Sequence, residues 1–75
     1  MLYKCYSDPL EDIVNEIRPV PIWTVEANNF DEMKKKVNDE MYEQGYEKDY
    51  WTETDFLGYR ALTDGNYNYI ISATL

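Results

Sequence analysis

One short part of the chain combines carboxylates with aromatic side chains. Seven carboxylates lie between positions 39 and 55, against a single cation, Lys48. The stretch is too acidic for an ordinary solvated face and too aromatic for a disordered acidic tail, because such tails are poor in aromatic residues. Carboxylates held on an aromatic framework could bind a basic protein groove. The candidate contact residues are Asp39, Glu40, Glu43, Tyr46, Glu47, Asp49, Tyr50, Trp51, Glu53 and Asp55.

The spacing of the later carboxylates suggests one way in which they could act. If the chain is extended here, positions 47, 49, 53 and 55 all point to one side, with i, i+2 neighbours about 6–7 Å apart. This is near the spacing of successive phosphates along one nucleic-acid strand. The same residues also fit a solvated acidic loop anchored by Tyr50 and Trp51. Positions 46–54 are compatible with a loop, a helical turn or an irregular strand, so both interpretations stay open.

The acids that precede this stretch contradict the usual electrostatics of a helix. Glu40 and Glu43 are i, i+3 neighbours near the C-terminal end of a predicted helix, where the helix dipole disfavours negative charge. The lysines at 34–36 lie too early to compensate. A sequence that breaks a local rule in this way often does so to form a binding surface. A second acidic patch at Asp8, Glu11, Asp12 and Glu16 is more ordinary, because acids at a helix start are favourable.

The residue types argue against catalysis. The chain has no histidine and one cysteine, so it offers no Ser-His-Asp or Cys-His arrangement and no thiolate or imidazole zinc site. Its three glycines are scattered, and a domain this small seldom leaves a pocket of the ~300 Å³ that a substrate needs. Asp49, Glu53 and Asp55 could offer oxygen ligands, but the EF-hand spacing is absent. We expect no enzyme, no cofactor and no specific metal site.

Composition predicts one domain over residues 1–75, with a net charge of −8. Such a surface repels nucleic acid and anionic lipid, and it attracts basic proteins. Alternatively, the excess acid only keeps the protein in solution. The lone Cys5 excludes an intramolecular disulfide, and we expect a buried, inert thiol. No stretch approaches the ~20 apolar residues of a membrane span and no signal peptide is evident, so we expect a cytoplasmic protein.

The first part of the chain reads as strand, helix and strand. Residues 1–6 alternate like a strand, and a helix follows with Asp8 as its cap and Pro9 in its first turn. This helix should end near Arg18, because Pro19 and Pro21 forbid its continuation. Residues 22–27 form the next strand. The predicted apolar face of the first helix contains Leu10, Ile13, Val14 and Ile17.

The second part begins with the clearest helix. Asn29 is a good N-cap, Glu32 completes a capping box, and Gly45 is a suitable C-terminal stop. Its buried stripe should contain Phe30, Met33, Val37 and Met41. Residues 56–62 and 67–75 read as strands joined by a hairpin at Asp64-Gly65-Asn66. The predicted fold is therefore α+β, in the order β-α-β-α-β-β, a two-layer sandwich with two helices on one face of a small, mostly antiparallel sheet.

The joint between the second strand and the second helix carries a resemblance. The run Val25-Glu26-Ala27-Asn28-Asn29-Phe30-Asp31-Glu32-Met33, a strand ending in alanine before a capped helix, resembles joints in very small phage proteins. These include anti-CRISPR proteins and the T7-type inhibitors of host RNA polymerase, and the resemblance covers about twenty residues. Size, acidity and lack of catalytic groups are also similar to DNA-mimic anti-restriction and anti-CRISPR proteins. The resemblance implies a phage-encoded protein acting in the bacterial cytoplasm.

The leading interpretation is a non-catalytic inhibitor that binds a basic, nucleic-acid-handling surface of a host protein, possible targets being a CRISPR effector, a restriction enzyme or RNA polymerase. Charge would steer association, and Tyr46, Tyr50 and Trp51 would hold the complex. An alternative is a small structural or assembly protein that self-associates through exposed strand edges at 1–6 or 67–75, giving a homodimer. A third is a regulatory subunit that raises the activity of its partner.

Overall fold

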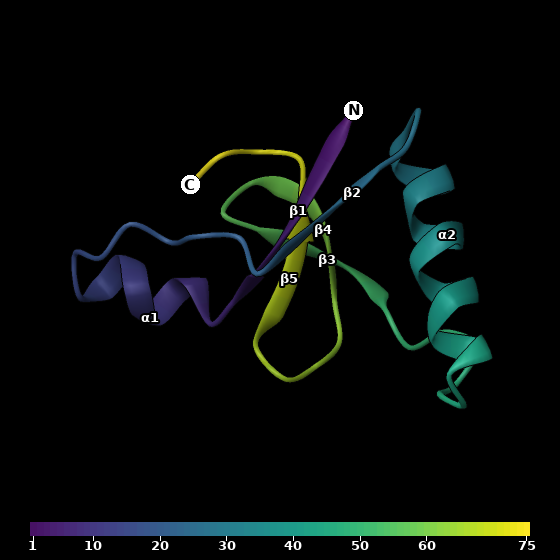
Figure 1. The fold of residues 1–75 in the computed structure, drawn as a ribbon. Coiled ribbons are helices and arrows are strands. Elements are labelled where there is room, and N and C mark those ends of the chain that lie inside the picture. Colours follow the sequence, from purple (N-terminus) through teal and green to yellow (C-terminus); the bar gives the residue numbers. More distant parts are fainter.

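The computed structural model describes residues 1–75 and contains two helices with a five-stranded antiparallel sheet (Figure 1). The α+β class is as predicted, but the order is β-α-β-α-β-β-β, with one strand more than expected. The elements are β1 (Leu2–Ser7), α1 (Pro9–Val14), β2 (Trp23–Glu26), α2 (Phe30–Glu43), β3 (Thr52–Phe56), β4 (Tyr59–Thr63) and β5 (Asn68–Ile71).

The sheet has the strand order β2-β1-β5-β4-β3. β1 lies inside it, because Cys5 is opposite Trp23 of β2 and also opposite Ile70 of β5. β5 is paired on both sides as well, with β1 and β4. The prediction that strands at 1–6 and 67–75 offer exposed edges is therefore wrong. The free edges belong to β2 and β3.

α2 covers one face of the sheet. Its Met33 and Val37 are buried against side chains from β1, β4 and β5. The helix begins as predicted, since the Asn29 side chain accepts a 2.8 Å hydrogen bond from the backbone N–H of Glu32. Phe30 and Met41 pack at the margin of the same cluster, so the predicted stripe is confirmed. The buried members of the cluster are Tyr3, Cys5, Ala27, Met33, Val37, Trp51, Leu62 and Ile70.

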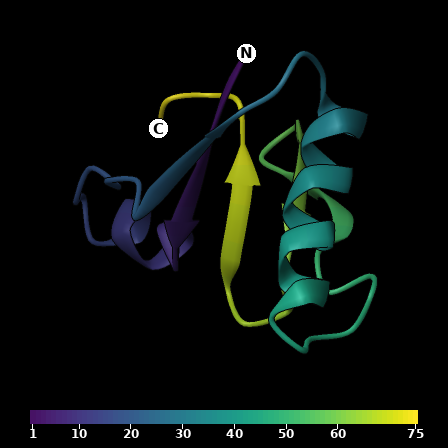
Figure 2. The same ribbon diagram turned by 45° about the vertical axis from the view of Figure 1, so that its right-hand side comes forward.

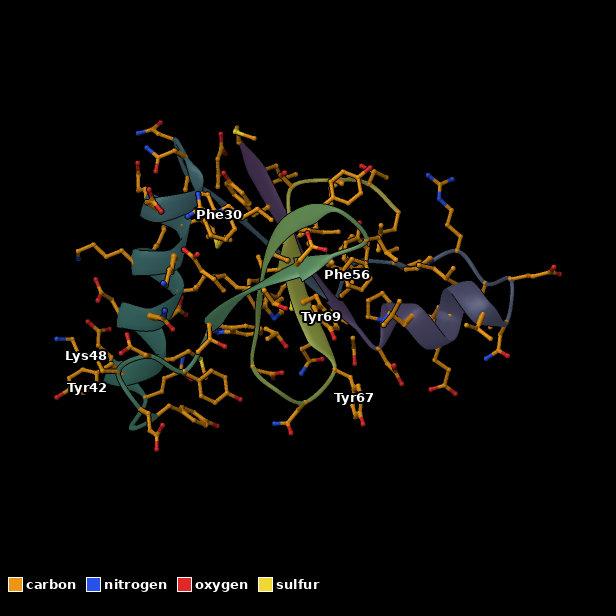
Figure 3. The ribbon with its side chains drawn as sticks, turned by 180° about the vertical axis from the view of Figure 1, so that it is seen from behind. Phe30, Tyr42, Lys48, Phe56, Tyr67 and Tyr69 are labelled. Carbon is orange, nitrogen blue, oxygen red and sulfur yellow. The ribbon has the colours of Figure 1, made fainter.

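The opposite face carries a smaller apolar cluster. Tyr6, Phe56, Ala61 and Ile71 are buried there, and the rings of Phe56 and Tyr69 lie with centroids 4.7 Å apart (Figure 3). The C-terminal residues cover part of this face, because Ala73 and Leu75 pack on the cluster. The predicted strand 67–75 accordingly stops at Ile71, and the rest of it folds over the sheet.

The two helices lie on opposite sides of the sheet, which differs from the predicted arrangement (Figures 1 and 2). α1 contributes no side chain to either cluster, and its predicted apolar residues Leu10, Ile13 and Val14 are exposed. Asp8 precedes the helix with φ 49° and makes no side-chain cap. Within α1, only Pro9 at the N-terminal end is buried, so the predicted apolar face of the helix does not pack on the sheet.

α1 ends earlier than the prolines required. Glu16 adopts φ 57°, which turns the backbone out of the helix. The N–H of Ile17 donates to the carbonyl of Asp12 at 2.7 Å, and the N–H of Glu16 donates to that of Ile13 at 3.1 Å. These two bonds form the Schellman arrangement, normally built with glycine at the left-handed position. The expected helix to Arg18 thus stops at Val14.

The predicted strand 56–62 is broken by a tight hairpin. Phe56 and Tyr59 are partners across β3 and β4, and the two residues between them, Leu57 and Gly58, have φ 50° and 84°. Positive φ at both central positions is the requirement of a type I′ turn. The hairpin predicted at Asp64-Gly65-Asn66 is confirmed, since it joins β4 to β5.

Candidate functional site

The end of α2 is fixed by backbone hydrogen bonds. Gly45 adopts φ 94°, and its N–H donates to the carbonyl of Tyr42 at 3.1 Å. The N–H of Tyr46 donates to the carbonyl of Met41 at 3.1 Å. This is the Schellman stop expected from Gly45. The chain leaves α2 in a loop that projects before it returns to β3 (Figure 2).

Asn38 anchors the far end of this loop. Its Nδ2 donates to the carbonyl of Trp51 at 3.1 Å, and its Oδ1 accepts from the N–H of Trp51 at 2.8 Å. Both bonds are buried, so they satisfy backbone groups that water does not reach. Asn38 was not among the predicted functional residues, because a polar residue beside a helical stripe does not reveal a partner thirteen positions away.

Four aromatic rings connect the loop to the sheet. The centroids of Tyr46 and Tyr50 are 5.0 Å apart, those of Tyr50 and Trp51 are 5.7 Å apart, and those of Trp51 and Trp23 are 6.0 Å apart. Each pair meets edge to face, a favourable geometry for aromatic rings. Trp51 is only 5% exposed. Trp51 therefore lies mostly in the core and is not the exposed contact that was predicted, whereas Tyr46 is exposed at the end of the row.

Three of the predicted contact carboxylates are engaged within the protein. Asp39 pairs with Lys35 at 2.6 Å, and this hydrogen bond raises the pKa of Lys35. Glu53 lies 2.9 Å from Arg60 and 3.6 Å from Lys34. Asp55 accepts from the N–H of Gly58 at 3.3 Å. These carboxylates hold local structure, so they are weaker candidates for a partner surface.

Arg60 also joins β4 to the start of α2. Its guanidinium lies 4.1 Å from the centroid of the Phe30 ring and 3.1 Å from the carboxylate of Asp31. Together with Glu53, these contacts fix the charged groups on this face of the sheet. Glu53 and Asp55 are exposed on one side of β3, but Glu53 is tied to Arg60 and to Lys34 of α2, and Asp55 is tied to the turn at Gly58.

The remaining four carboxylates form what we call the acidic end: Glu40, Glu43, Glu47 and Asp49. All four are exposed, and none makes an ion pair or a side-chain hydrogen bond. Lys48, labelled beside Tyr42 in Figure 3, lies at this end of the molecule and forms no ion pair. Residues 46–50 are not a strand, so the predicted phosphate-like row through 47, 49, 53 and 55 is wrong.

The second acidic patch lies elsewhere. Glu11 is close enough to Asp8 for a hydrogen bond between the two carboxyl groups to raise the pKa of Glu11. This patch belongs to α1, which lies across the sheet from α2 (Figure 1). The two patches therefore do not form one continuous negative face.

A cavity of about 470 Å³ adjoins the acidic end, between β2 and the C-terminal half of α2. It exceeds the size expected for so small a domain. Trp23, Tyr50 and Trp51 line it, together with the carboxylates of Glu40 and Asp64. Cys5 is also among its lining residues, and burial together with the charge of Asp64 raises the pKa of the Cys5 thiol to about 12. No local sequence pattern predicts this cavity, because its walls come from distant segments.

Further properties of the chain concern metal binding, membrane spanning and similarity to known proteins. No three histidine, cysteine, aspartate or glutamate side chains converge in a way that could hold a metal ion. Neither helix has the length and apolar run needed to cross a bilayer. Comparison with protein-family models, with curated proteins and with solved structures finds no match for this chain.

Proposed function

We propose that this protein is a non-enzymatic inhibitor that binds the basic, nucleic-acid-handling surface of a host protein in the bacterial cytoplasm. The observation that carries the proposal is the acidic end, whose four carboxylates are exposed and unpaired on the last turn of α2 and on the firmly anchored loop that follows it. A basic groove would supply the missing counter-charges. Anti-CRISPR or anti-restriction action is the form of inhibition that we favour.

Preorganisation supports this role. The Schellman stop at Gly45 and the two Asn38 bonds fix both ends of the loop, so the carboxylates lose little conformational freedom when a partner binds. Their position at the negative end of the α2 dipole adds to the local negative potential. Charge of this kind steers association and raises the on-rate, and salt screens it. The proposal does not need the regular phosphate spacing of a DNA mimic.

The test uses capture from bacterial lysate on the immobilised protein, with elution by a salt gradient and identification by mass spectrometry. We expect one nucleic-acid-binding protein, released at moderate salt and displaced by duplex DNA. The Glu43→Lys, Glu47→Lys, Asp49→Lys triple variant should lose this capture. These three side chains are exposed and make no ion pair or hydrogen bond within the protein, so the circular dichroism spectrum should not change.

A matched control separates local recognition from net charge. The Glu11→Lys, Glu16→Lys, Glu26→Lys triple variant makes the same change in net charge on exposed residues outside the acidic end. We expect it to retain capture of the same protein. Equal losses in the two triple variants would show that only overall charge matters, and retention by the acidic-end variant would refute the proposed surface.

Self-association is the second candidate function, and exposed apolar residues favour it. Val14 is 79% exposed and Ile17 is 56% exposed, and the edges of β2 and β3 are unpaired. A dimer formed this way would be insensitive to salt, because it would bury apolar surface. Multi-angle light scattering distinguishes a self-associating protein from a monomeric inhibitor. A salt-insensitive dimer that Ile17→Glu converts to monomer, without capture of any basic protein, would support assembly over inhibition.

A further inference from the structure

The cavity beside the acidic end has walls suited to a flat cation. Trp23 and Trp51 meet at an interplanar angle of 80°, and Tyr50 and Trp51 meet at 78°. Rings at right angles present both faces and edges to the space between them, as in sites that hold cations against aromatic faces. Trp23 is 39% exposed, so this wall is accessible from solvent. The volume of about 470 Å³ lies within the usual range for ligand pockets.

The charged groups in the cavity all have one sign. Its lining includes Glu40 and Asp64 but no lysine or arginine. The two oxygens of Asp64 are held in place, because one accepts from the N–H of Asn66 at 2.8 Å and the other from Nδ2 of Asn68 at 2.7 Å. Burial raises the pKa of Tyr50, and the nearby charge of Asp64 raises it further.

We propose that this cavity binds the guanidinium group of an arginine side chain presented by the basic partner. The proposal rests on the proposed function, since that partner supplies the arginine. A planar guanidinium can stack on an indole while its N–H groups donate to carboxylates, which an ammonium does less well. Its methylene stem would pack against Val25 and Met41, which also line the cavity.

The probe is N-acetyl-arginine amide, compared with the citrulline and lysine analogues. Trp23 and Trp51 are the only tryptophans, so their two indole N–H signals in a ¹H–¹⁵N NMR spectrum report directly on this cavity. We expect saturable shifts of both signals with the arginine compound. The uncharged citrulline analogue should bind at least about tenfold more weakly, equivalent to about 1.4 kcal/mol. Equal binding of citrulline or lysine, or no shift, would overturn the proposal.

Two glutamates on α2 provide the matched variants. Glu40→Gln removes a carboxylate from the cavity, and Glu43→Gln removes one a turn away that does not line it. We expect the first to weaken binding of the arginine compound several-fold and the second to leave it unchanged. An equal effect of both variants would show that the compound responds to surface charge and would overturn the site.

The outcomes also separate this site from the proposed function. Binding of the arginine compound in the cavity, combined with failure of the lysate capture, would retain an arginine site and reject the inhibitor. Successful capture that depends on Glu43, Glu47 and Asp49, without any effect of the compound on the indole signals, would retain the inhibitor and reject the arginine site.

Discussion

Replacement of Asn38 by alanine should be among the most damaging single changes in this protein. The change deletes both side-chain partners of Trp51 and leaves a buried N–H and a buried carbonyl without hydrogen bonds. Each unsatisfied buried group costs about 1–3 kcal/mol, so the expected loss for the two groups is about 2–6 kcal/mol. A chain of this length has a total stability of about 4–11 kcal/mol. The variant should therefore lose a large part of its stability.

Urea denaturation followed by circular dichroism measures this loss. Asn15→Ala is the matched control, because Asn15 is exposed and its side chain makes no hydrogen bond. We expect the control to change the free energy of unfolding by less than about 0.5 kcal/mol. A similarly small effect of Asn38→Ala would refute the assignment of Asn38 as the anchor of the loop.

An Asn38→Asp variant tests the direction of the hydrogen bonds. The carboxylate keeps an acceptor for the N–H of Trp51 but places a negative oxygen against the carbonyl of Trp51. This repulsion, together with burial, disfavours the charged form, so the pKa of Asp at this position should be raised. Stability should then be highest at acidic pH, where the protonated group donates, and should fall as pH rises through that pKa. Lack of any pH difference from the wild type would contradict the geometry.

Three further predictions follow from single residues. Leu57→Asn should raise the free energy of unfolding by about 1 kcal/mol in urea titrations, because asparagine tolerates positive φ; a decrease would contradict the turn. Met33→Ala should lower it by about 2–5 kcal/mol, since Met33 is fully buried, and a loss below 1 kcal/mol would argue against the core position. Burial raises the pKa of the Cys5 thiol from about 9 to about 12, so its contribution to stability is complete below pH 9. The free energy of unfolding should then fall by about 1.4 kcal/mol for each pH unit between 9 and 12. Cys5→Ala should lack this slope when stability is measured against pH.

The sequence predicts an element correctly where several local signals, such as a cap, an apolar stripe and a stop residue, indicate the same element. In α2, the Asn29 cap, the apolar stripe and Gly45 all point to the same helix, and the structure confirms each of them. The Asp64-Gly65 turn carries its own signature in the same way. The excess of acids over bases between positions 39 and 55 predicted exposed charge, and four of the seven carboxylates are indeed exposed and unpaired.

The features that were missed use residues in conformations unusual for their type. Leu57 and Glu16 both take positive φ, where glycine or asparagine is expected, so the turn after β3 and the end of α1 had no visible signal. The pairing of Asp39, Glu53 and Asp55 was missed for another reason. The Glu53–Arg60 ion pair forms only once β3 and β4 are paired, and Asp55 accepts from the Gly58 N–H only in the turn between these strands. The Lys35–Asp39 pair is local, at i, i+4 on α2, and was overlooked. Trp51 could not be assigned to the core without its distant partners.

The clamping of the loop at Gly45 and Trp51 has an evolutionary consequence. Both clamps act largely on the backbone, so the exposed positions 47–49 between the aromatic residues Tyr46 and Tyr50 carry little of the fold and can vary nearly independently of it. Even doubling the length of such a loop adds only about 0.6 kcal/mol of closure entropy. The scaffold can therefore accept new loop sequences, by mutation or by grafting, and acquire a different target while the sheet and α2 stay as they are.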